Sequence, residues 1–147
     1  CIRAAYKNQE IIVRNPYSIR PYQHVLEPLY VYLMIAKAQY ENIEFAGYYN
    51  VGPDECDCVT TGDLVEIFCK EWGNGQAWKN VCSKGPHEAQ FLKLDCSKLK
   101  TVFGWKPRWH IDGAVAKTVE WAKVYKNNGN ISACMESQIK EFCGVEK

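Results

Sequence analysis

Short apolar runs alternate with longer segments of helical periodicity along the 147 residues of this chain. Residues 10–14 predict a short strand that stops before Pro16, because the residue preceding a proline avoids the helical region. A long helix is predicted over residues 24–40, whose apolar side chains recur at three- to four-residue spacing: Val25, Leu29, Leu33, Ala36 and Tyr40. This alternation of strands and helices predicts an α/β fold.

The rest of the chain continues the alternation, mostly with helices. The expected elements are a buried strand over 45–51, a helix beginning at Thr60 or Thr61 and ending at 72–73, strands over 77–82 and 89–94, a two-turn helix capped by Asp95 or Ser97, a helix from Asp112 to about residue 126, and a last helix over 132–142. Ile2, Ala5 and Tyr6 predict the last turn of a helix at the start. Because the chain opens with Cys1 rather than Met, we expect residues 1–147 to be one domain of a longer protein.

The charge balance argues against two classes of partner. Eighteen basic and seventeen acidic residues give a formal net charge of +1, which supplies no field for a phosphate backbone or an anionic membrane. No apolar run is long enough for a transmembrane helix. We therefore expect neither nucleic acid nor a membrane as a partner.

The eight cysteines include no C-x-x-C pair, which excludes zinc ribbons and thioredoxin-like redox motifs. Cys56, Cys58 and His87 together offer three tetrahedral ligands, but without a second ligand pair we interpret the two cysteines as free thiols in a loop. The sequence thus predicts no metal site. With no secretory signal in view, reduced thiols and a cytoplasmic location are expected.

Catalytic and cofactor-binding motifs are also missing. Residues 73–75, Gly-Asn-Gly, resemble the start of a dinucleotide fingerprint, but the third glycine is absent and the run follows a helix rather than a strand. No tyrosine is followed four residues later by lysine, and no hydrolase nucleophile motif occurs. We therefore expect no catalytic residue and no cofactor-binding residue in this chain.

Several motifs in the sequence resemble a known family. They are Arg-Asn-Pro at 14–16, Arg-Pro-Tyr-Gln-His-Val-Leu-Glu-Pro at 20–28, Tyr-Asn-Val-Gly-Pro at 49–53, Pro-His-Glu-Ala at 86–89, Asp-Cys-Ser-Lys at 95–98, Gly-Trp-Lys-Pro at 104–107 and Thr-Val-Glu-Trp at 118–121. Together they resemble the carboxy-terminal part of the CDP-glucose 4,6-dehydratases, a family of the extended short-chain dehydrogenase/reductase superfamily. The motifs at 95–107 are typical of the whole superfamily, whereas those at 20–28 and 86–89 are narrower. The family usually has Trp where this chain has Tyr22.

The resemblance implies that cofactor binding and substrate binding belong to different parts of the full-length protein. Family members bind NAD on an amino-terminal Rossmann half, which also carries the acid/base residues and is absent from this chain. They convert CDP-glucose to CDP-4-dehydro-6-deoxyglucose and water, by hydride transfer to NAD, elimination across C5 and C6, and return of the hydride to C6. The product feeds deoxysugar synthesis for lipopolysaccharide. This chain would be the smaller substrate-binding lobe, mostly helices with a few short strands, and inactive alone.

The resemblance also suggests which residues hold the CDP-sugar. Arg20 is the expected diphosphate contact, since arginine's planar fork suits phosphate. Arg14 and Asn15 are candidates for the base or phosphate, although Arg14 is equally compatible with a solvated strand end. Gln23 and His24 either contact substrate or cap the long helix. His87 and Glu88 suit a ribose hydroxyl or the cytosine amine, with a loop cap as the alternative.

Two other functions stay open. One is a sugar-nucleotide epimerase or reductase of the same superfamily, which shares the motifs at 95–107. The other is a freestanding nucleotide-binding module with no enzyme attached. As a dehydratase, the full-length protein is expected to be a homo-oligomer, and this chain is expected to pack against the missing Rossmann half.

Overall fold

The computed structural model describes residues 1–81 and 91–144 of the chain. In chain order, its elements are α1 (Ile2–Tyr6), β1 (Ile11–Val13), α2 (Leu26–Glu41), the 3₁₀ turns η1 (Ile43–Phe45) and η2 (Glu55–Asp57), α3 (Thr61–Trp72), β2 (Trp78–Asn80), α4 (Ser97–Phe103), α5 (Ile111–Lys126) and α6 (Ile131–Cys143). Within these ranges no helix is both long and apolar enough to cross a membrane.

The sheet of the described residues consists of β1 and β2, which pair in parallel with Ile11 opposite Trp78. Side chains on a strand point alternately to opposite faces. Accordingly Ile11 and Val13 are buried, whereas Ile12 is 53% exposed. Two strands are too few for a Rossmann sheet, and the predicted mostly helical α/β class with a few short strands is confirmed.

Helix α3 begins and ends where the sequence predicts. The Thr60 hydroxyl accepts the backbone N–H of Asp63, and the Asp63 carboxylate accepts the backbone N–H of Thr60, which completes a capping box. At the other end, Gly73 adopts a φ of 73°, a conformation that glycine enters without steric cost. The apolar side of the helix, including Val65 and Phe68, faces the core.

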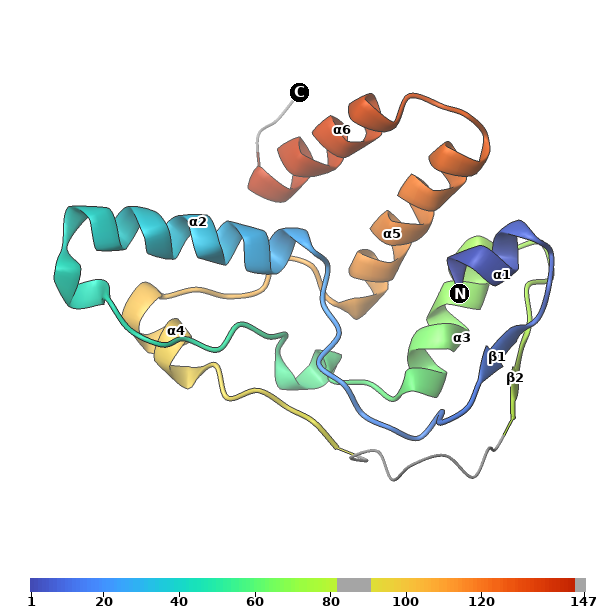
Figure 1. The fold of residues 1–147 in the computed structure, drawn as a ribbon, viewed down its shortest axis with the longest axis horizontal. Coiled ribbons are helices and arrows are strands. Elements are labelled where there is room, and N and C mark those ends of the chain that lie inside the picture. The colour runs from blue at the N-terminus through green and yellow to red at the C-terminus, as the bar shows by residue number, and fades with distance from the viewer. Residues whose placement is uncertain (82–90, 145–147) are drawn as a thin grey trace.

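The main hydrophobic core lies between α1, the sheet, α3 and α5 (Figure 1). The three- to four-residue spacing of apolar residues in helix α5 predicts an inner stripe of Val115, Thr118, Val119, Ala122 and Tyr125, of which Val115, Val119 and Ala122 are buried. Thr118 and Tyr125, which the same periodicity placed on this stripe, are exposed. The stripe is therefore narrower than the spacing of apolar residues suggests.

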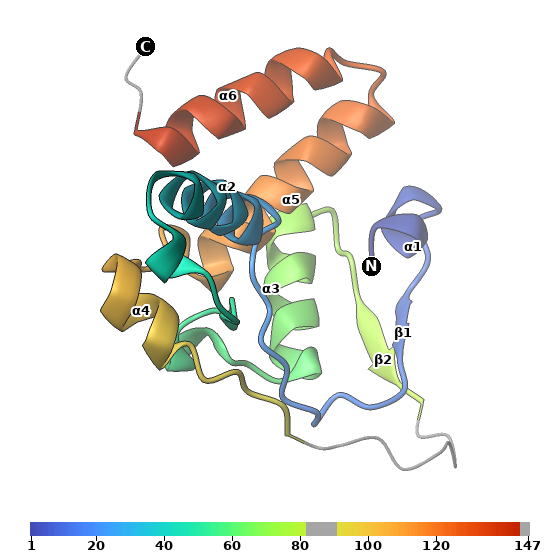
Figure 2. The same cartoon turned by 60° about the vertical axis from the view of Figure 1, so that its left-hand side comes forward.

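A second, smaller core joins α2 to α4. Val31 and Leu99 are fully buried there, and Trp105 lies against them at 4% exposure. Gly104 ends α4 in the left-handed conformation, with a φ of 61°, and turns the chain so that Trp105 points inward. Figure 2 shows α2 and α4 together on one side of the molecule, with α3 and the strands on the other.

A buried carboxylate links the two cores. Glu27, in the first turn of α2, is 1% exposed. Its Oε1 accepts the backbone N–H groups of Arg108 and Trp109, both at 2.8 Å. These donors lie in the segment that leads from Trp105 into α5, so Glu27 fixes the position of α2 relative to α5.

The helix predicted over residues 24–40 is present as α2, but the apolar residues whose spacing marks it lie on its exposed side. Val25, Leu29, Leu33 and Tyr40 are between 46% and 93% exposed, while the buried positions are Glu27 and Val31. Apolar residues occur all around this helix, so periodicity alone could not choose a face. Because Glu27 must reach the buried N–H groups of Arg108 and Trp109, the side of α2 that carries Glu27 and Val31 faces inward.

Two predicted strands are also absent from the described residues. Residues 46–53 are irregular after η1, and no described strand lies beside them to complete a ladder. Tyr48 in this stretch is 96% exposed. Of the predicted strand over 89–94, residues 89 and 90 lie outside the described range, and Phe91 forms only an isolated bridge with Ile19.

Replacing Glu27 tests the link between the two cores. Glu27→Ala leaves two buried N–H donors without an acceptor, and we expect it to lower the free energy of unfolding by about 2 to 5 kcal/mol. Glu27→Gln keeps a carbonyl acceptor and should recover at least half of that loss. Urea denaturation of the chain measures both. As a matched control, Glu41→Ala at the exposed end of α2 should change stability by less than about 0.5 kcal/mol; equal losses at positions 27 and 41 would contradict the assignment.

Candidate functional site

The loop between β1 and α2, residues 14–24, carries most of the residues that the sequence assigns to substrate. It is tied by its backbone to the start of α3. Gly62 donates its N–H to the Pro16 carbonyl at 2.8 Å, Thr61 donates to Ser18 at 2.9 Å, and the Arg20 N–H donates to Val59 at 3.3 Å. These bonds hold an irregular segment in one conformation, which a binding loop needs.

Side-chain hydroxyls reinforce this attachment. Thr61 Oγ1 lies 2.9 Å from both Ser18 Oγ and Tyr22 OH, so one threonine of α3 connects two points of the loop. A Cβ at Gly62 would approach the Pro16 carbonyl to 3.2 Å, which explains why a residue without a side chain sits at this contact. Tyr22 thus uses its phenol oxygen to anchor the loop.

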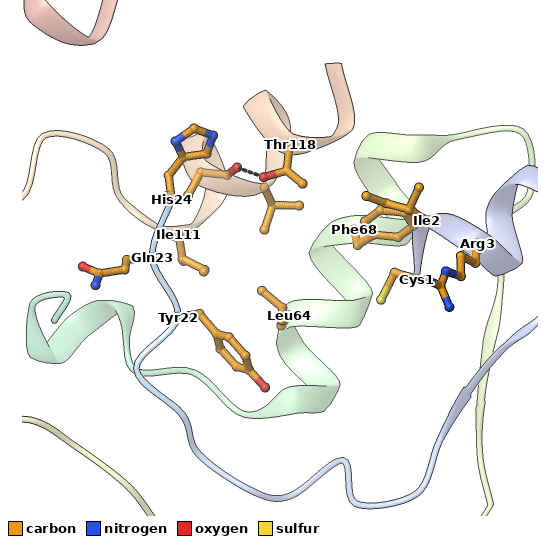
Figure 3. A pocket seen from close by; sticks show the side chains of 12 residues that line it. Cys1, Ile2, Arg3, Tyr22, Gln23, His24, Leu64, Phe68, Ile111 and Thr118 are labelled. Carbon is orange, nitrogen blue, oxygen red and sulfur yellow. Dashed lines mark hydrogen bonds between the residues drawn. The ribbon is translucent and has the colours of Figure 1, made fainter. Parts of the chain in front are cut away.

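A cavity of about 500 Å³ opens beside the end of this loop (Figure 3). Tyr22, Gln23 and His24 line it together with α3, the start of α5 and the first residues of the chain. Its volume lies in the range of small-molecule sites. Most of the remaining lining is apolar, from Leu64, Phe68, Ile111, Ala114 and Val115. Such a surface suits the apolar part of a ligand, or a packed side chain, better than a diphosphate.

Arg14, Asn15 and Arg20 do not line this cavity. The Arg20 guanidinium donates from Nη1 to the carbonyl of Ile19 at 2.9 Å. Arg14 is exposed directly after β1. Asn15 is half-buried, and its carbonyl accepts the Ser18 hydroxyl at 3.2 Å. The structure therefore brings Tyr22, Gln23 and His24 together at the cavity and places Arg14, Asn15 and Arg20 earlier on the same anchored loop.

His24 contacts the start of α2, as one of its two alternatives expects, and it also lines the cavity. Its Nδ1 accepts the backbone N–H of Leu26 at 3.3 Å, at the start of α2. The ring is buried and packs edge-on against Trp109, with centroids 4.8 Å apart. Burial, together with the nearby charge of Lys117, lowers the pKa of His24 below its ordinary value of 6.5.

Gln23 has a polar atom that a substrate could contact. Its side-chain amide donates to the carbonyl of Val51 at 3.3 Å, which leaves Oε1 as an acceptor. This oxygen is buried and has no hydrogen-bond partner among the described residues. A buried acceptor without a donor is costly, so a ligand or a further protein group that donates here would be favoured.

The other predicted pair, His87 and Glu88, lies outside the described residues. Further along the chain, Leu92 donates its backbone N–H to the Ile19 carbonyl at 3.2 Å, so this segment contacts the loop over residues 14–24.

Sequence reasoning missed a second cluster, formed by Asp57 and His110. The His110 ring lies 2.8 Å from the buried Asp57 carboxylate, and this hydrogen bond and charge raise the pKa of His110. The two residues are 53 positions apart, and neither belongs to a recognisable motif. Only the folded arrangement of η2 and α5 brings them together.

Comparison with known proteins gives one informative match. No protein-family model matches the chain. Over 142 residues, which are 96% of its length, the chain is 38% identical to the CDP-glucose 4,6-dehydratase of Salmonella typhimurium. The chain is similar to a CDP-glucose 4,6-dehydratase. This finding confirms the resemblance that the motifs at 14–28 and 86–107 predict.

The similarity concerns part of the relative only. The chain spans 40% of the length of the Salmonella dehydratase, whereas nearly all of the chain is matched. The similar residues therefore correspond to a portion of a larger enzyme.

The environment of His24 predicts how stability depends on pH. Because the pKa of His24 is lower in the folded chain than in the unfolded chain, its contribution to stability is complete above 6.5 and is lost as the pH falls through the lowered value. His24→Asn keeps an acceptor for the N–H of Leu26 and removes the titration. Urea denaturation at a series of pH values should show that wild type loses stability toward acid more steeply than the variant. Parallel pH profiles for the two proteins would contradict this account.

Proposed function

We propose that this chain is the substrate-binding domain, residues 1–147, of a CDP-glucose 4,6-dehydratase. The observation that carries the proposal is the 38% identity to such an enzyme over 96% of the chain. The full-length protein would convert CDP-glucose to CDP-4-dehydro-6-deoxyglucose and water, for deoxysugar synthesis in surface polysaccharide. It would act as a cytoplasmic homo-oligomer.

Within this proposal the loop over 14–24 holds the nucleotide-sugar. Arg20 supplies the fixed positive charge and paired N–H donors that a diphosphate needs. Arg14 and Asn15 lie on the same anchored loop, and the buried Oε1 of Gln23 offers an acceptor for a ligand hydroxyl or amine. His87 and Glu88 would complete the contacts to ribose or base.

NAD would bind to the part of the relative that this chain does not cover. The Gly-Asn-Gly run does not have the geometry of a dinucleotide-binding turn, because Gly73 and Gly75 follow the end of α3 instead of joining a strand to a helix. Gln76 donates its N–H to the Gly73 carbonyl at 3.0 Å, which closes this turn on itself. We therefore assign no cofactor contact to this chain.

The exposed side of α2 supports a large intramolecular partner. Val25, Tyr32 and Leu33 are 57% to 74% exposed, and Tyr40 is 93% exposed. Soluble surfaces seldom expose so many large apolar side chains on one element. With 60% of the relative's length beyond the matched part, we propose that the Rossmann half covers this face.

Enzyme assays separate the proposal from its alternatives. The full-length protein, incubated with NAD and CDP-glucose, should give a product lighter by one water in mass spectrometry, while the present chain should give none. Turnover without net loss of water would favour an epimerase or reductase. Product formed by the present chain alone would contradict the assignment of the chemistry to the missing half.

Arg20 can be tested by calorimetric titration of the full-length protein with CDP. Arg20→Ala should weaken binding by roughly 10- to 150-fold, because a charge-assisted hydrogen bond contributes about 1.5 to 3 kcal/mol. Arg20→Lys keeps the positive charge but lacks the planar guanidinium, so its affinity for CDP should lie between those of the wild type and Arg20→Ala. Lys37→Ala, an exposed basic residue on α2, is the control and should bind normally. Normal binding by Arg20→Ala would remove Arg20 from the diphosphate site.

A further inference from the structure

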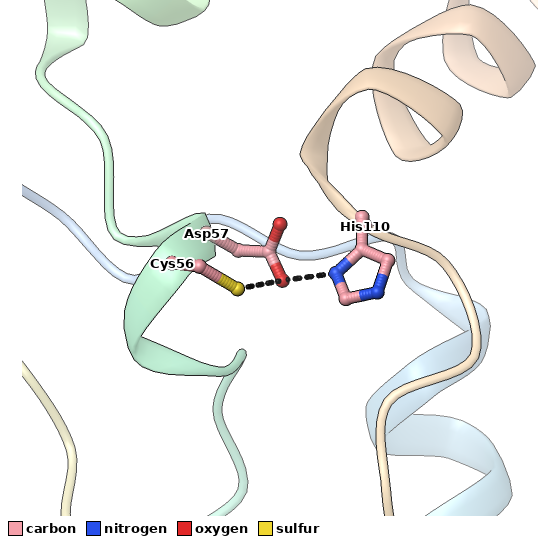
Figure 4. A group of neighbouring side chains, drawn as sticks. All are labelled: Cys56, Asp57 and His110. Atoms are coloured by element: carbon pink, nitrogen blue, oxygen red, sulfur yellow. Dashed lines mark hydrogen bonds and ion pairs between the residues drawn. The ribbon is translucent and has the colours of Figure 1, made fainter.

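Three side chains with different metal-binding atoms meet between η2 and the start of α5 (Figure 4). Cys56 Sγ lies 3.8 Å from Asp57 Oδ2, and His110 Nδ1 lies 2.8 Å from the same oxygen. The ligand atoms that the three residues offer all lie within 4.8 Å of one another. A thiol, a carboxylate and an imidazole are the ligand types that zinc takes in proteins.

Two of the three separations approach those around a single bound ion, and the third, between Cys56 Sγ and the His110 ring, lies within 4.8 Å and would shorten as the exposed side chains close on the ion. Zinc binds nitrogen, oxygen and sulfur at about 2.0 to 2.3 Å, so two ligands of one tetrahedral ion are about 3.3 to 3.8 Å apart. The separation of Cys56 Sγ and Asp57 Oδ2 already has this value. The separation of Asp57 Oδ2 and His110 Nδ1 is that of a hydrogen bond and would lengthen by a few tenths of an ångström as a metal replaces the proton.

The surroundings hold the central ligand in place. Asp57 is 4% exposed, and its other oxygen, Oδ1, accepts the backbone N–H of Ile111 at 2.9 Å. This is the outer contact that orients a metal-binding carboxylate. Cys56 and His110 are exposed, so an ion can enter from solvent. A thiolate and a carboxylate balance the charge of a divalent cation, and the neighbouring Asp54 is bonded to Lys100.

A catalytic cysteine explains the cluster less well. A nucleophilic thiol needs a base, usually an imidazole, within hydrogen-bond reach. Here the Cys56 thiol donates to the Asp57 carboxylate, and the His110 nitrogen nearest to the cluster is engaged by that same carboxylate. The arrangement therefore gathers ligands around one point and does not line up a proton relay.

We propose that Cys56, Asp57 and His110 bind a divalent cation of the zinc class, with water as the fourth ligand. The ion would join η2 to His110, the residue that precedes α5, and so connect positions 53 residues apart. Its three protein ligands leave the fourth coordination position to water, the ligand number of catalytic rather than structural zinc sites. The dehydratase proposal neither requires nor predicts this site.

Titration of the reduced, metal-free chain with Zn²⁺, and with Co²⁺ as a spectroscopic probe, tests the site. One equivalent of Co²⁺ should bind with the visible absorption of a tetrahedral thiolate site. Cys56→Ser and His110→Gln should each weaken Zn²⁺ binding by more than about tenfold, the least that even an outer ligand contact is worth. Both side chains are exposed, so these variants should fold. Cys143→Ser, which alters an exposed thiol elsewhere, should bind normally.

Three results would overturn the proposal. The first is Zn²⁺ binding by the wild-type chain no tighter than by Cys56→Ser, which would indicate scattered thiols. The second is normal binding by His110→Gln with weak binding by Cys58→Ser, which would indicate a site at the two loop thiols instead. The third is no Co²⁺ absorption at one equivalent, which would leave Asp57 and His110 as a hydrogen-bonded cap on α5.

Discussion

Two buried carboxylates hold the segment that enters α5, and the arrangement of the helices depends on them. Glu27 of α2 accepts the N–H groups of Arg108 and Trp109, and Asp57 of η2 accepts the N–H of Ile111. These donors lie where an extended link becomes a helix, so they have no partners within α5 itself. Because buried N–H groups without acceptors are costly, the two carboxylates decide where α2 and η2 sit around α5.

Sequence reasoning succeeded where the signal is local. The capping box and terminal glycine of α3, the left-handed Gly104 after α4 and the buried stripe of α5 follow from residues within a few positions of each other. Where distant residues decide, it chose no inner face for α2 and predicted a strand over 45–51 that is absent from the described residues. The inner face of α2 depends on donors about 80 positions away, which no periodicity of the helix encodes. The predicted strand over 45–51 likewise lacks a neighbour with which to pair.

The candidate site shows the same contrast between residues that local motifs identify and residues that only distant contacts bring together. Motifs identified the loop over 14–24, and the structure explains why this loop is fixed, through the bonds of Pro16 and Ser18 to the start of α3. The sequence left two roles open for His24, and in the folded chain its ring accepts the N–H of Leu26 and also lines the cavity. Asp57 and His110 were missed because two residues 53 positions apart form no recognisable motif in the sequence. An anchored loop with arginine donors, beside an apolar cavity, suits a domain that holds a nucleotide-sugar while another part of the protein performs the chemistry.

Hydrogen exchange of the full-length protein, with and without CDP-glucose, tests this account most directly. The account predicts that the ligand slows exchange in the backbone amides of residues 14–24, with the largest effect around Arg20. Full-length protein that binds CDP-glucose without protection in this loop would contradict the assignment of the chain as the substrate-binding domain.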